Sequence, residues 1–194
     1  TVVAVVLQSE GKGPFCAGAS FDELIAINDL DSGKKFFSGF ANVINAMKNC
    51  KKLIIGRIHG KAVGGGVGLA AACDYTFATA NSAAKLSEFT IGIGPFVIAP
   101  AVERKIGKTK LAQMTIDAST WHDAIWCEKN NLYTKVFDDV TQMDQAIENL
   151  ILQLASYNPE ALSQMKTVLW EGTENWSELL YERAEISGKL VLSD

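Results

Sequence analysis

A glycine-rich segment that follows an apolar run constrains the fold of this chain more than any other feature. Residues 53–59 read LIIGRIH, which is typical of a buried strand, and residues 61–74 read KAVGGGVGLAAACD. Glycine and alanine bury little surface, so a stretch this poor in large side chains indicates that backbone approaches something closely. The small residues from Val67 to Cys73 predict a helix that packs tightly against its neighbours.

Other patterns in the first part of the chain alternate between strand and helix. An apolar run at 2–8 (VVAVVLQ) and an alternating pattern at 74–80 (DYTFATA) predict two further strands. Between them, residues 32–50 carry apolar side chains at helical spacing, with Ser32 as the expected N-cap. Strands that alternate with helices indicate an α/β fold with a parallel sheet.

Helical patterns dominate the later part of the chain. One predicted helix covers 99–106 and ends at Gly107, a residue favoured beyond helix C-termini, and WHDAIWCEKN at 121–130 predicts another. From Thr141 the periodicity is helical almost to the end. We therefore expect a core over 1–140 and a helical C-terminal region over 141–194.

Length, composition and charge exclude several classes of protein. The chain has 194 residues, 48% of them hydrophobic, and no apolar run approaches the ~18 residues that span a membrane. A net charge of −4 argues against a nucleic-acid binder that uses a broad basic face. The chain opens on a strand-like run and stops soon after a helical pattern, so both ends are treated as incomplete.

The cysteines favour an intracellular protein without a metal site. There are four, they form no CxxC pair, and only His59 and His122 accompany them. This spacing does not suit a zinc site, so we expect no metal, reduced thiols and a cytoplasmic location.

Two glycine-containing segments each follow a predicted strand, namely PFCAGAS at 14–20 and VGGGVG at 63–68. In parallel α/β sheets, ligands gather at the carboxyl ends of strands, where loops and helix N-termini present free amides. Two amides aimed at one point form an oxyanion hole, which stabilises negative charge on a carbonyl oxygen. The spacing alone is equally compatible with two tight turns.

A dinucleotide-binding interpretation competes with this one. Residues 66–71 (GVGLAA) fit the loose pattern GxGxx[GA], and an acidic residue, Glu88, lies about 20 residues further on. However, several residues separate the glycines from the strand, and the interpretation leaves FCAGAS unexplained.

Glu88 is the candidate acid/base. It lies in the mostly apolar stretch KLSEFTIGIG, and burial would raise its pKa and suit it to accept and return a proton near neutral pH. The alternative is an exposed glutamate at the end of a strand. Asp22 and Asp74 are expected to be structural or surface residues, and His59 a hydrogen-bonded histidine at a strand end.

Three motifs in this order resemble the crotonase family, the enoyl-CoA hydratase/isomerase superfamily: FCAGAS, IIGRIHGKAVGGGVGLAAACDYTFAT and KLSEFTIGIGP. The resemblance covers nearly the whole chain. It implies a spiral of ββα units followed by a helical trimerisation region, assembled as a homotrimer or a dimer of trimers. It also implies an acyl-CoA thioester substrate and no cofactor, because coenzyme A is part of the substrate.

The resemblance assigns roles residue by residue. The backbone amides of Ala19 and Gly65 would hold the thioester carbonyl, and Glu88 would be the acid/base. The loop from Ala19 to Asp22 would lie along the pantetheine and adenine of coenzyme A. The implied substrate-binding residues are Ala17, Ala19, Ser20, Phe21, Asp22, Gly64 and Gly65.

One departure from the family pattern bears on the reaction. Hydratases that use two glutamates have an acid three residues after the glycine that matches Gly65, and this chain has Gly68 there. A single carboxylate can still move a proton between Cα and Cγ, so Δ3–Δ2 isomerisation is slightly favoured over two-acid hydration. The alternatives are a one-acid hydratase-lyase and a CoA-thioester-binding homologue without efficient hydratase activity.

Overall fold

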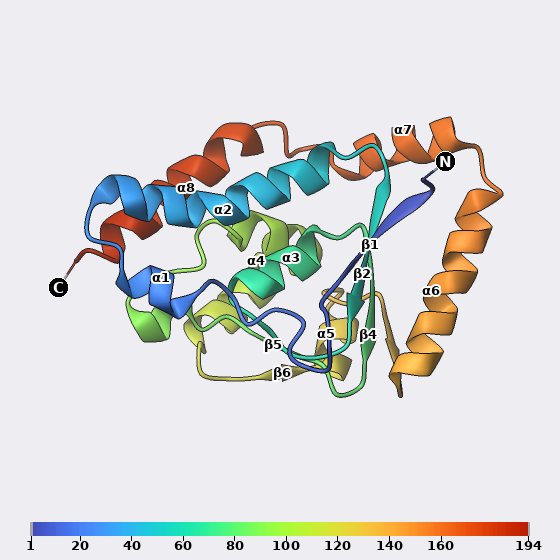
Figure 1. The fold of residues 1–194 in the computed structure, drawn as a ribbon, viewed down its shortest axis with the longest axis horizontal. Helices are drawn as coiled ribbons and strands as arrows, with labels where there is room; N and C mark the ends of the chain where they lie inside the picture. The colour runs from blue at the N-terminus through green and yellow to red at the C-terminus, as the bar shows by residue number, and fades with distance from the viewer. Residues whose placement is uncertain (1, 194) are drawn as a thin grey trace.

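The computed structural model describes residues 2–193 and contains a four-stranded parallel sheet (Figure 1). Most side chains of its two central strands, β2 and β4, are buried. Burial on both faces explains why the sequence of β2 begins with a continuous apolar run. The predicted α/β class and the three predicted strands are confirmed. In spatial order the strands are β1 (Ala4–Gln8), β2 (Leu53–Ile58), β4 (Tyr75–Thr79) and β7 (Lys135–Phe137).

Helices cover both faces of this sheet. On one face, α6 packs Met143 and Ile147 against Phe77 of β4. On the other face, α2 and α3 build the larger core, and Figure 1 shows the strands between these helices and α6. The small residues of α3 allow it to lie close to its neighbours, as the sequence predicted. The helices are α2 (Leu30–Asn49), α3 (Gly65–Ala72) and α6 (Val140–Ala155).

A second, three-stranded sheet lies beside the first and supports the glycine segment. Its strand β3 directly precedes α3 and pairs in parallel with β5, which pairs antiparallel with β6. The residues before α1 extend this sheet through a bridge between Cys16 and Ala62. The strands are β3 (Ala62–Val63), β5 (Ala83–Lys85) and β6 (His122–Asp123).

Two predicted helix starts are wrong. The N-cap of α2 is Asp29, whose carboxylate accepts the Ser32 N–H at 2.7 Å, so Ser32 stands inside the helix and closes a capping box. The segment 121–130 begins as strand β6, and α5 starts only at Ala124. There Asp123 is the N-cap and accepts the Trp126 N–H at 2.7 Å. A carboxylate cap decided the boundary in both places.

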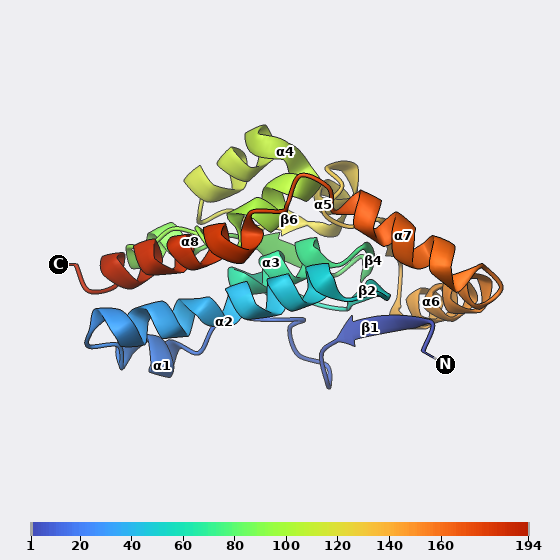
Figure 2. The ribbon, with the colours of Figure 1, turned by 90° about the horizontal axis from the view of Figure 1, so that it is seen from above.

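The C-terminal helix α8 lies along α2 in both views of the fold (Figures 1 and 2). A Cβ added to Gly33 would lie 3.0 Å from the Cα of Gly188, so the two helices meet backbone to backbone. No helix among residues 2–193 has the length and apolar character needed to cross a membrane. The remaining helices are α1 (Phe21–Ile25), η1 (Glu88–Ile91), α4 (Ala99–Ile116, kinked at Gly107), α5 (Ala124–Lys129), α7 (Pro159–Leu169) and α8 (Trp176–Leu190).

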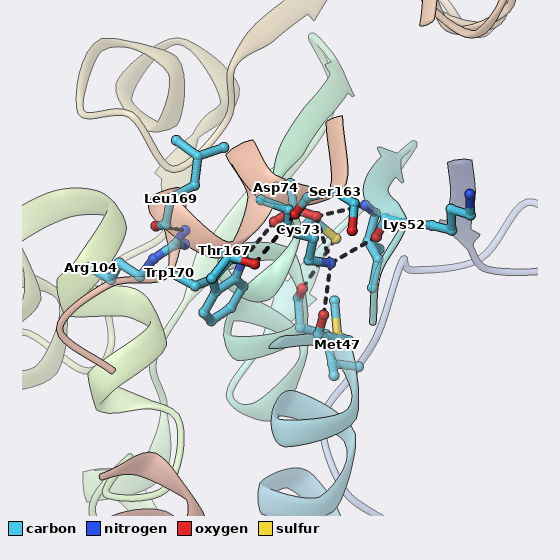
Figure 3. A network of polar contacts seen from close by, with 12 residues as sticks. Met47, Lys52, Cys73, Asp74, Arg104, Ser163, Thr167, Leu169 and Trp170 are labelled. Atoms are coloured by element: carbon cyan, nitrogen blue, oxygen red, sulfur yellow. Dashed lines mark hydrogen bonds and ion pairs between the residues drawn. The ribbon is translucent and has the colours of Figure 1, made fainter. Parts of the chain in front are cut away.

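A buried ion pair between Asp74 and Lys166 joins the sheet to α7 (Figure 3). The two side chains are 2% and 3% exposed, and Lys166 Nζ lies 3.0 Å from Asp74 Oδ2. The Asp74 carboxylate also accepts the Ile54 N–H and the Trp170 Nε1–H, each at 2.7 Å. Lys166 Nζ donates further to the carbonyl oxygens of Met47 at 2.9 Å and Lys52 at 2.8 Å. The structural role expected for Asp74 is confirmed.

Replacing Lys166 by Met is expected to lower the free energy of unfolding by about 3–5 kcal/mol, because it leaves the Asp74 charge buried without its cation. Urea denaturation at pH 7 measures this change. Lys34→Met is the control, since Lys34 pairs with Glu185 at 3.1 Å on the surface, where a pair contributes ~1 kcal/mol or less. Equal losses of unfolding free energy in the two variants would show that the buried pair contributes no more to stability than the surface pair.

Candidate active site

The two glycine-containing segments predicted to meet lie side by side. The Cys16 N–H donates to the Lys61 carbonyl at 3.2 Å, and the Val63 N–H donates to the Cys16 carbonyl at 2.9 Å. At Gly18, where φ is +94°, an added Cβ would lie 3.3 Å from the Val63 oxygen and 4.0 Å from the Gly65 nitrogen. This left-handed backbone therefore brings the FCAGAS segment against the start of α3.

Ala19 and Gly65 line the same cavity, which measures about 250 Å³. Among residues 2–193, none of the hydrogen bonds has the backbone N–H group of either residue as its donor. Gly65 is the first residue of α3, where amides lack intrahelical partners, and Gly64 before it has a φ of 53°. Two free amides, one of them at a helix N-terminus, can stabilise a developing negative charge.

Glu88, the first residue of η1, lines the same cavity. A Cβ added to Gly64 would lie 3.0 Å from its Oε1, so the carboxylate stands directly beside the glycine segment. Its Oε2 is buried and has no hydrogen-bond partner. Burial raises the pKa of Glu88 from 4.5 to about 7, because the apolar surroundings disfavour the charged form. Such a carboxyl group can accept and return a proton near neutral pH.

The rest of the cavity is apolar. Glu88 is the only ionisable side chain among the described residues that line it, and Ser87 and Ser187 are the only others with polar side-chain atoms. Phe37, Phe96 and Ile98 are examples of the apolar lining. The cavity thus offers one acid/base group in surroundings that suit an uncharged hydrocarbon group.

Phe40 is a site residue that the sequence analysis missed. A Cβ added to Gly65 would lie 2.6 Å from Phe40 Cε2, so the aromatic ring rests directly on this glycine. Phe40 lines both the 250 Å³ cavity and a neighbouring cavity of about 680 Å³. Its helical spacing with other apolar residues indicates only core packing, and the sequence holds no other signal.

The remaining predicted binding residues fall into three groups. Ala17 and Phe21 line the 250 Å³ cavity together with Gly64. Ser20 lines the neighbouring cavity and also caps α1, where its Oγ accepts the Glu23 N–H at 3.3 Å. Asp22 is exposed in the first turn of α1 and lines neither cavity.

The geometry does not fit the dinucleotide interpretation. The helix begins at Gly65, so Gly66 and Gly68 lie within α3 and not in a turn before it. A Cβ at Gly66 would lie 2.8 Å from the Cys16 Cβ, which shows that this glycine makes room for the FCAGAS segment. Within residues 2–193, no three His, Cys, Asp or Glu side chains come together as metal ligands would.

Comparison with known proteins places the chain in a family. The model of the enoyl-CoA hydratase/isomerase family matches residues 1–186. A peroxisomal Delta(3,5)-Delta(2,4)-dienoyl-CoA isomerase of Arabidopsis thaliana is 23% identical over 188 residues, which cover 89% of this chain and 66% of that protein. A short-chain-enoyl-CoA hydratase of Clostridium acetobutylicum is 28% identical over 174 residues, which cover 89% of this chain and 66% of that protein.

Solved structures agree with this placement. The crystal structure of an enoyl-CoA hydratase from Mycobacterium avium superposes with a TM-score of 0.86 at 26% identity, covering 98% of this chain and 72% of that one. The chain spans 66% and 54% of the length of two of the curated relatives that it matches. The family resemblance seen in the sequence is confirmed: this chain belongs to the enoyl-CoA hydratase/isomerase family.

Proposed function

We propose that this chain catalyses Δ3–Δ2 isomerisation of an unsaturated acyl-CoA thioester. One observation carries the proposal: Glu88, whose Oε2 has no hydrogen-bond partner, lines the same apolar cavity as Ala19 and Gly65. Within residues 2–193, the N–H groups of Ala19 and Gly65 donate no hydrogen bond. This arrangement supplies one proton carrier and one place for an oxyanion. Isomerisation requires these two elements.

In the proposed mechanism, the amides of Ala19 and Gly65 hold the thioester oxygen of a 3-enoyl substrate. The Glu88 carboxylate removes a proton from Cα, and the electrons of the C–H bond move toward the carbonyl, which becomes an enolate oxygen. The protonated Glu88 then gives the proton to Cγ, where the electrons of the Cβ–Cγ double bond form the new C–H bond. The enolate oxygen returns to a carbonyl, and the double bond now lies between Cα and Cβ. The substrate gains and loses no atoms overall. Each amide donor would lower the activation barrier by about 3 kcal/mol.

A one-acid hydratase or hydratase-lyase is the second candidate. It is supported by the names of relatives, since several are hydratases of enoyl-CoA thioesters. A homologue that binds CoA thioesters without efficient hydratase activity is the third, and the absence of an acid at Gly68 motivates it. Assays with 2-enoyl, 3-enoyl and 3-hydroxyacyl thioesters distinguish these candidates.

The proposal extends to the coenzyme A moiety and to assembly. The 680 Å³ cavity shares Ala19, Phe36 and Phe40 with the site, so we assign the pantetheine chain to it. Its lining also holds one basic and one acidic residue, Lys35 and Glu23. Residues 20–22, which were expected to follow coenzyme A, begin beside this cavity. Assembly as a homotrimer or a dimer of trimers and a cytoplasmic location stay predictions.

Glu88→Gln is expected to retain acyl-CoA binding and to lower kcat on 3-enoyl-CoA about 10²–10⁴-fold, the usual contribution of a general acid/base. Absorbance of the conjugated enoyl thioester follows turnover, and calorimetric titration follows binding. Glu148→Gln, on the exposed face of α6, is the matched control. Full activity in the Glu88 variant would eliminate the proton-transfer role.

The pH profile of kcat/KM is expected to fall below about pH 7. The reaction begins with the carboxylate form of Glu88, and its pKa is raised to about 7 by burial. Each pH unit below that value therefore lowers the fraction of protein with an ionised Glu88 about tenfold. An acid limb near pH 4.5, the ordinary pKa of glutamate, would contradict this assignment.

The same pKa affects stability. Between about pH 4.5 and 7 the folded protein binds more protons at Glu88 than the unfolded chain does, so the free energy of unfolding falls as the pH rises. We expect Glu88→Gln to be more stable than the natural protein by about 3 kcal/mol at pH 8, with the gain vanishing below pH ~4.5. Urea denaturation at pH 4 and pH 8 measures both values. An equal change in unfolding free energy at pH 4 and pH 8 would show that ionisation of Glu88 does not cause the change.

A further inference from the structure

Gly68 and Ile98 fit together as a pair. Gly68 lies buried on α3, and Ile98 is the N-cap residue of α4, with 3% of its surface exposed. A Cβ added to Gly68 would lie 2.5 Å from the Ile98 Cβ and closer still to its Cγ2. Ile98 therefore occupies the volume into which any side chain at position 68 would extend.

Ile98 also lines the cavity that holds Glu88. A side chain at position 68 would therefore meet Ile98, which itself forms part of the cavity wall. A bound water needs two to four polar partners, and the sec-butyl side chain of isoleucine offers none.

We propose that Ile98 determines the outcome of the reaction by excluding water from the side of the cavity next to Gly68. This inference rests on the proposed function. Isomerisation moves one proton from Cα to Cγ through Glu88 and adds nothing. Hydration adds the water oxygen to Cβ and a proton to Cα, so it requires a water held in place beside the acyl chain. With Ile98 over Gly68, neither a water site nor a second acid is available. The proton therefore returns to the acyl chain of the substrate.

Ile98→Ala tests the proposal by opening space beside Gly68. We expect the ratio of hydration to isomerisation to rise about tenfold or more, which corresponds to a barrier difference of ~1.4 kcal/mol. Reactions in D₂O should also show more deuterium in the isomerised product, because Glu88 then exchanges its proton with admitted water. Chromatography with mass spectrometry measures both quantities.

Ile106→Ala is the matched control. Ile106 lies on the same helix α4, is buried in the core, and lines neither the 250 Å³ nor the 680 Å³ cavity. The Ile106→Ala substitution removes the same atoms as Ile98→Ala and leaves an apolar cavity away from the site. We expect it to leave both the product ratio and the deuterium content as in the natural protein.

A second pair of variants tests the steric fit directly. Gly68→Glu alone is expected to lower the unfolding midpoint strongly and to gain no hydratase activity, because Ile98 fills the required space. Gly68→Glu combined with Ile98→Ala is expected to recover much of the midpoint and to hydrate 2-enoyl-CoA faster than Ile98→Ala does. A folded, hydrating Gly68→Glu single variant would overturn the inference.

The outcomes separate this inference from the proposed function. If the natural protein isomerises and Ile98→Ala changes neither ratio nor deuterium content, Ile98 does not exclude water and only this inference fails. If no variant turns over any enoyl-CoA, the proposed function fails. Infrared titration of the Glu88 carboxyl then still tests the inference, since admitted water should move its pKa toward the ordinary value in Ile98→Ala and not in Ile106→Ala. An unchanged titration would overturn it.

Discussion

The candidate site depends on one close approach between two backbone segments, residues 16–19 and 63–66. Hydrogen bonds between Cys16 and both Lys61 and Val63 set their register, and glycines at the contact leave no Cβ between them. This approach places two free amides at one cavity, with the N-terminus of α3 behind one of them. Everything else in the site, including Glu88, is placed relative to this contact. Preorganised amides of this kind need no rearrangement when charge develops.

Much of this could be predicted from the sequence, because strong local patterns survive in the fold. The apolar run of β2 and the alternating segment of β4 both form largely buried strands, and the small residues of α3 form the expected helix. Glu88 lies in an apolar stretch, and the structure places it in an apolar cavity. Helix starts were harder to predict. Asp29 and Asp123 cap helices whose apolar periodicity begins elsewhere, and periodicity does not report which side chain bonds to a free amide.

Long-range pairs could not be predicted, because nothing local to either partner signals the other. Lys166 reads as a surface lysine on a helix, yet it neutralises Asp74 almost one hundred positions earlier. Phe40 reads as a core residue, yet its ring rests on Gly65. Gly68 reads as a missing acid, and only the fold reveals that Ile98 has taken its space. In each pair the structural role of one residue depends on where the fold places the other.

The contact between Gly33 and Gly188 has a consequence for the order in which the protein matures. Helix α2 carries Phe40 into the cavity wall, α8 braces α2 along its length, and Ser187 of α8 lines the cavity itself. During synthesis, residues 16–88 leave the ribosome long before α8 does. The amides and Glu88 therefore wait in an unfinished pocket, open to solvent, until α8 docks. A nascent chain stalled before α8 would hold every proposed catalytic group and still lack the part of the cavity wall at Ser187 and the helix that packs along α2.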